Sequence, residues 1–92
     1  MEFEHKRFGK CVVSDITQKQ LEEFHRALKG KESEPMSVWR GETVRQAVKL
    51  GIMIEPKMTV EQVDESKPSL IIWLADCVAK AFAEAVEVDP LS

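Results

Sequence analysis

Tyrosine is absent from this chain of 92 residues, and cysteine, glycine and proline are scarce. With only four glycines the chain has few places for a loop that cradles a phosphate, and no nucleophile-elbow or nucleotide-binding motif is present. No serine, histidine and acidic residue show a spacing that suggests catalysis. We therefore predict that the protein is not an enzyme and needs no cofactor.

Histidine and cysteine are too sparse to suggest a metal centre. His5, His25, Cys11 and Cys77 include none of the close pairs that zinc sites use, so we predict no metal. A bridge between the two cysteines is chemically possible, but nothing in the sequence indicates an oxidising compartment, where disulfides usually persist. Glu22 and Glu23 are adjacent on a charged helix face and are interpreted as solvated residues.

Neither a dominant charge nor a long apolar run is present. The net charge is −3 and basic residues alternate with acidic ones, so we expect no nucleic-acid partner. No segment reaches about 18 uncharged apolar residues, and the first ten residues, MEFEHKRFGK, are charged where a signal peptide is apolar. We expect a cytoplasmic protein with no membrane partner.

The composition, 43% hydrophobic and 32% charged, is that of a globular domain. A chain of this mass buries about 64% of its surface on folding, which supports one modest core. We predict a single domain over residues 1–92.

Four stretches of this domain have a sequence pattern that predicts local structure, and three of them lie in the first 51 residues. Residues 1–14 are predicted to be extended, as a bent strand or a small hairpin that turns near Gly9. Residues 15–30 are predicted to form a helix, with a capping box at Thr17 and Gln20 and a stop at Gly30. A second helix is predicted over 37–51.

The remaining sequence supplies an apolar patch cut by Pro56, then an acidic, turn-like segment, and then a long helix over 67–88 that Pro68 opens. Together these stretches predict a mainly α fold: a small three-helix domain with an extended N-terminal strand or hairpin and a long apolar C-terminal helix.

The C-terminal helix is apolar around most of its circumference. Its polar residues fall within an arc of about 80°, which leaves roughly 280° apolar. Ala75, Ala79 and Ala83 form a row of small residues beside a ridge of bulky ones, and small residues allow another backbone to approach closely. Either this helix is the centre of the domain, or one apolar face meets a second copy or another protein.

Trp73 lies inside the polar arc of this helix, next to Asp76 and Lys80. Two interpretations remain open. An aromatic residue among charges is a common anchor of protein interfaces. Alternatively, the loop before Pro68 covers the indole ring.

Three segments, DITQKQLEEFHRAL, VRQAVKLGIM and KPSLIIWLADCVAKAFAEAVEVDP, occur in this order. Together they resemble the small tail assembly chaperones of long-tailed bacteriophages over about residues 8–90. The order of the segments and the run Pro68, Trp73, Leu74, Ala75 carry the resemblance. The stretch KLGIM departs from it, because many relatives have an aromatic residue after the glycine.

The resemblance implies a non-enzymatic viral protein that binds the tape-measure protein, assists assembly of the tail-tube protein and forms a homo-oligomer in the host cytoplasm. It suggests Trp39, Ile52, Met53 and Trp73 as partner-binding residues, in addition to the alanine row. The alternative is a small cytoplasmic inhibitor or adaptor that docks on a host enzyme.

Overall fold

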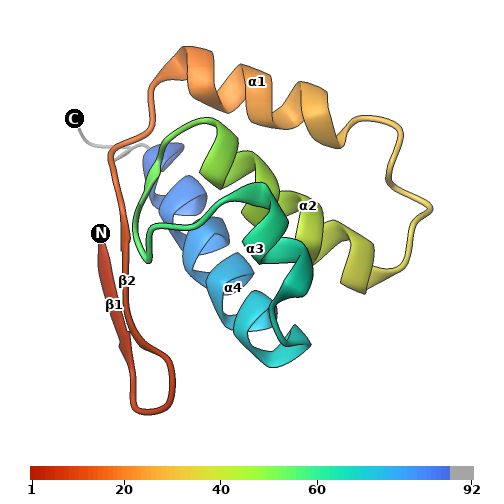
Figure 1. Ribbon diagram of the computed structural model, residues 1–92. Helices are drawn as coiled ribbons and strands as arrows, with labels where there is room; N and C mark the ends of the chain where they lie inside the picture. The colour runs from red at the N-terminus through yellow and green to blue at the C-terminus, as the bar shows by residue number, and fades with distance from the viewer. Residues whose placement is uncertain (88–92) are drawn as a thin grey trace.

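The computed structural model describes residues 1–87, which form a hairpin, a third short strand and four helices (Figure 1). The strands are β1 (Glu2–His5), β2 (Gly9–Val13) and β3 (Met53–Glu55). The helices are α1 (Gln18–Leu28), α2 (Met36–Lys49), α3 (Val60–Glu65) and α4 (Pro68–Ala85). The helix predicted over 67–88 extends to residue 88, which lies outside the described residues.

The predicted mainly α, three-helix fold is wrong. The described part of the chain is a mixed α/β fold, 56% helical and 14% strand, with four helices and a three-stranded antiparallel sheet. The error lies in residues 52–66, where the sequence suggested an apolar patch and a turn. This segment instead adds β3 to the sheet and then forms α3.

A second capping box explains why α3 forms. The Gln62 amide donates to the Thr59 hydroxyl oxygen at 3.1 Å, and the Gln62 side-chain oxygen accepts from the Thr59 amide at 2.9 Å. These two bonds satisfy backbone N–H groups that a helix start otherwise leaves free. Val63, on the inner side of this short helix, is buried and anchors it to the core.

The N-terminal segment is a hairpin, with strand order β1-β2-β3 in the sheet. Gly9 starts β2 with a φ of 90°, a backbone conformation that residues other than glycine rarely adopt. Alternation along β2 points Cys11 and Val13 into the core, where both are fully buried. The sheet extends to β3 by pairing of Val13 with Met53, next to an irregularity in register.

Local signals also fix α1. The predicted capping box is confirmed, because the Thr17 hydroxyl accepts from the Gln20 amide and the Gln20 side chain accepts from the Thr17 amide. Gly30, with a φ of 87°, follows the helix end. Phe24 of α1 stacks on Phe82 of α4 with ring centroids 4.2 Å apart, which attaches α1 to the end of the last helix.

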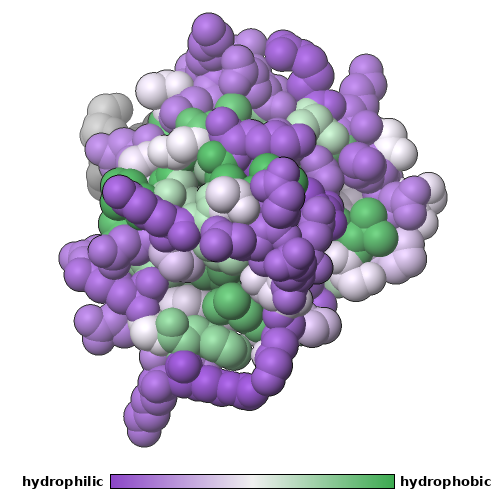
Figure 2. Space-filling model, in the orientation of Figure 1, coloured by the Kyte–Doolittle hydropathy of each residue, from purple (hydrophilic) through white to green (hydrophobic). Residues whose placement is uncertain are grey.

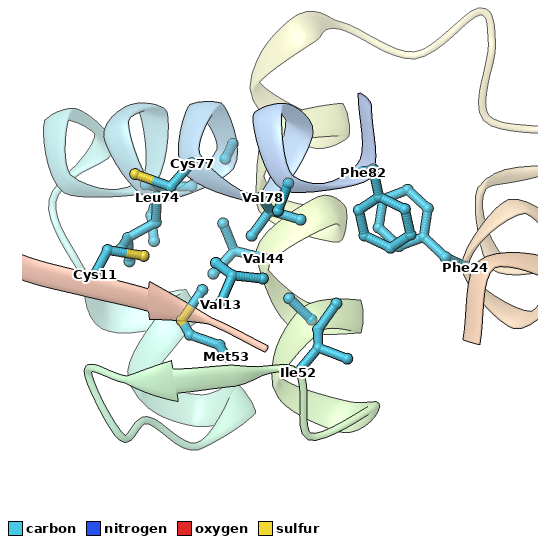
Figure 3. Packing of buried hydrophobic residues seen from close by; sticks show 14 of the residues in the cluster. Cys11, Val13, Phe24, Val44, Ile52, Met53, Leu74, Cys77, Val78 and Phe82 are labelled. Carbon is cyan, nitrogen blue, oxygen red and sulfur yellow. The ribbon is translucent and has the colours of Figure 1, made fainter. Parts of the chain in front are cut away.

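The core lies between the sheet and the crossing helices α2 and α4 (Figures 1 and 3). Val44 of α2 and Leu74 and Val78 of α4 are fully buried at its centre. The hairpin covers one side of α4 and α2 covers another, so α4 is the helix around which the domain is built. The positions of the hairpin and α2 determine which apolar residues of α4 remain exposed to solvent.

Candidate functional site

Most of the apolar circumference of α4 is covered by the chain itself. The buried side comprises Ile71, Leu74, Ala75, Cys77, Val78, Ala81 and Phe82. The opposite side, which carries the charged residues Asp76, Lys80 and Glu84, is exposed. Helix α2 and strand β2 pack against α4, and their contacts explain why less of α4 is uncovered than its composition suggested.

A narrow apolar strip nevertheless remains on the outer side of α4. It consists of Ile72, Ala79 and Ala83, all exposed, and we refer to it as the α4 strip. The Ile72 side chain is 41% exposed and is the largest apolar side chain of the strip. Near its start, Ser37, Arg40, Pro68, Ile71 and Ile72 line a small cleft of about 70 Å³.

Met36 adds to the apolar surface at this end of the molecule. It is the first residue of α2, next to the cleft residue Ser37, and is 62% exposed. Figure 2 shows hydrophobic colour broken into small patches among hydrophilic side chains on the face in view. Neither Met36 nor Ile72 was predicted as a contact residue from the sequence, and Met36 lies just before the helix predicted over 37–51.

The alanine row predicted from the sequence divides between inside and outside. Ala75 is 7% exposed and belongs to the core. Ala79 and Ala83 are exposed and form part of the α4 strip. Because 3.6 residues make one turn, a spacing of four drifts around the helix, and the row crosses the edge of the buried face.

The other predicted contact residues are dispersed. Ile52 and Met53 are buried in the core, where the Ile52 carbonyl accepts from the Ser14 amide at 2.7 Å. Trp39 is half-buried and lines an open cleft of about 470 Å³ together with His25, Arg26, Leu28, Lys29 and Glu32. The structure therefore does not bring the two tryptophans and the alanines into one surface.

Trp73 is covered by the hairpin. Its ring centroid lies 5.7 Å from that of Phe8, in a stacked arrangement, and 5.5 Å from that of His5. Both neighbours lie at or beside the turn between β1 and β2. The position of Trp73 among charged residues of α4 is thus explained by an aromatic cover from the N-terminus, which neither sequence interpretation included.

Charged side chains join α2 to α3. Arg45 donates from Nε to Asp64 at 2.7 Å and from Nη1 to Glu42 at 3.2 Å. Burial raises the pKa of the Glu42 carboxyl, but hydrogen bonds from Gln46 and Arg45 outweigh this effect, so the pKa is lowered overall. Of these contacts, the one between Arg45 and Asp64 links the two helices.

Comparison with protein-family models, curated proteins and solved structures gives no match to this chain. Within residues 1–87, no three histidine, cysteine or acidic side chains group closely enough to hold a metal ion. No helix of the described chain has the length and apolar character needed to cross a membrane.

Proposed function

We propose that this protein is a non-enzymatic tail assembly chaperone that binds a phage tape-measure protein and assists assembly of the tail tube. In this proposal it acts in the host cytoplasm and associates with copies of itself between clients. The observation that carries the proposal is the α4 strip, an apolar surface left exposed on the most buried helix of the domain. The order of the sequence segments that resemble this chaperone family supports the identity of the client.

The form of the strip suits reversible binding. Ala79 and Ala83 are small, so the backbone of a partner helix can approach α4 closely. Ile72 and Met36 provide larger side chains at one end, where an anchoring contact gains most from burial. Asp76 and Lys80 flank the strip and keep the free surface hydrated, which limits non-specific aggregation.

Ala79→Arg tests whether the strip mediates association. The side chain at this position is exposed, so we expect the melting temperature to change little, as for other surface substitutions. We expect the mass measured by light scattering to fall toward that of a single chain, because an arginine would have to be buried against the partner. Ser33→Arg adds the same charge on the exposed loop between α1 and α2 and is the matched control. An unchanged mass for Ala79→Arg would count against the strip as a self-association surface.

Co-expression with a tape-measure fragment tests the client. We expect the soluble fraction of the fragment to rise with the wild-type protein and with Ser33→Arg, and to rise less with Ala79→Arg. A fragment that is equally insoluble with and without the protein would favour the alternative, an inhibitor or adaptor that docks on a host enzyme.

A further inference from the structure

The two cysteines of the chain, distant in sequence, meet in the core. Cys11 lies on β2 and Cys77 on α4, and their exposed fractions are 0% and 2%. Both are free thiols, and Figure 3 shows them on facing elements of the core, Cys11 on the strand and Cys77 on the helix. Strand β2 packs against α4, and each thiol shifts the pKa of the other, so the two side chains are close neighbours in the core.

The pair is placed where the hairpin meets the helix that it covers. Cys11 is one of two fully buried side chains of β2, and Cys77 is one turn along α4 from Trp73, which the hairpin turn covers. A covalent bond between these sulfur atoms would therefore fasten the hairpin to α4. It would also close a loop that contains α1, α2, β3 and α3.

We propose that Cys11 and Cys77 form a reversible disulfide when a hydroperoxide reaches them, and that this bond locks the hairpin onto α4. In the first step one thiolate attacks the peroxide and the O–O bond breaks. The sulfur gains a hydroxyl group, and the rest of the peroxide takes up a proton and leaves as water or an alcohol. In the second step the other thiol displaces the hydroxyl group as water, and the S–S bond forms. The two sulfurs supply the two electrons that reduce the peroxide.

The closed structure protects the pair from oxidation. Burial raises the pKa of Cys11 to about 12 and also raises that of Cys77, so both thiols are protonated while the hairpin is in place. Thiolate chemistry therefore requires the hairpin to lift.

The test uses the full-length wild-type protein, reduced and then exposed to hydrogen peroxide without denaturant. After alkylation of free thiols, we expect a single-chain product that has lost two hydrogens and carries no alkyl group. Tryptic digestion should join the peptides of residues 11–19 and 58–80, and dithiothreitol should separate them. We expect the melting temperature of the oxidised form to rise by on the order of 10 °C, because the bridge closes a long loop.

The rate of oxidation tests whether the hairpin protects the two thiols. The rate of bridge formation should be lower than that of peroxide oxidation of the same thiols in the urea-unfolded chain, and it should increase in urea concentrations below the unfolding transition. Cys77→Ala should yield oxygen adducts or cross-linked dimers of Cys11 and no intramolecular product. Three results would overturn the proposal: a wild-type chain that only gains oxygen atoms, one that links only to other chains, and one that forms the bridge only when unfolded.

Discussion

Replacement of Trp73 by alanine tests how much the aromatic contacts between the hairpin and α4 contribute to stability. Truncation of a fully buried aromatic residue costs about 3–5 kcal/mol, and the half-buried position of Trp73 reduces this cost. The lost aromatic contacts with Phe8 and His5 each contribute about 0.5–1.5 kcal/mol. We therefore expect a loss of about 2 kcal/mol in the free energy of unfolding and a decrease of about 10 °C in melting temperature.

Urea denaturation gives the total loss, and hydrogen exchange followed by mass spectrometry shows where it acts. Because the contacts of Trp73 run to the hairpin turn, we expect exchange in residues 2–13 to accelerate more than exchange in α2. Trp39→Ala is the matched control, since Trp39 is also a half-buried tryptophan but lies in the cleft beside α1.

Two outcomes would refute this reasoning. If hairpin exchange is unchanged in Trp73→Ala, the aromatic contacts do not hold the hairpin in place. If both tryptophan variants affect the hairpin equally, the effect is a general loss of stability. A change in oligomeric mass for Trp73→Ala alone would instead support the interpretation of Trp73 as an interface anchor.

Three further predictions concern packing and charge. Phe24→Ala removes the stacked contact with Phe82 and should lower the free energy of unfolding by about 3 kcal/mol in urea denaturation, because α1 loses its attachment to α4; a loss below 1 kcal/mol would contradict this. Gly41→Ala should raise the melting temperature, corresponding to about 0.5–1 kcal/mol of helix propensity, since the Arg45 guanidinium, 3.3 Å from the new methyl group, has to shift only slightly; a lower melting temperature would show that the contacts with Asp64 and Glu42 hold Arg45 in place. The lowered pKa of Glu42 means that its stabilising effect is present above the ordinary value of 4.5 and is lost as the pH falls through the lower folded value. Glu42→Gln should therefore lose less stability than wild type between pH 5 and pH 3 in urea denaturation at each pH, and equal losses would refute the assignment.

The elements that could be predicted are those with strong local signals. Thr17 and Gln20 identify the start of α1, and Pro68 identifies the start of α4, because each satisfies or removes backbone N–H groups at a helix end. The hairpin was one of two alternatives for the N-terminus. Its choice over a bent strand depends on pairing between β1 and β2, which a residue pattern this short does not fix.

The elements that were missed are short and depend on distant contacts. Three residues of β3 carry no periodicity, and the strand exists because Met53 pairs with Val13, forty positions earlier. The Thr59 and Gln62 capping box was readable in the sequence, but the acidic residues after it suggested a turn. Given the same weight as Thr17 and Gln20, the Thr59 and Gln62 pair predicts the start of α3.

The candidate surface was only partly predictable for a related reason. The sequence indicates which residues of α4 are apolar, but exposure depends on which neighbours cover them. Ala75 and Ala79 differ by a single turn, and only the packed structure separates the buried residue from the exposed one. The aromatic cover of Trp73 comes from Phe8 at the opposite end of the chain, beyond the reach of helical periodicity.

The packing of the N-terminal hairpin against α4, the last helix, has a consequence for synthesis of the protein. A ribosome translating about 5–20 residues per second needs several seconds to proceed from β2 to the end of α4. During that interval the nascent hairpin lacks the helix that covers Cys11, although β3 is already available to pair with β2. A truncated chain that ends before Pro68 would lack α4 and its part of the core, and we expect proteases to degrade it.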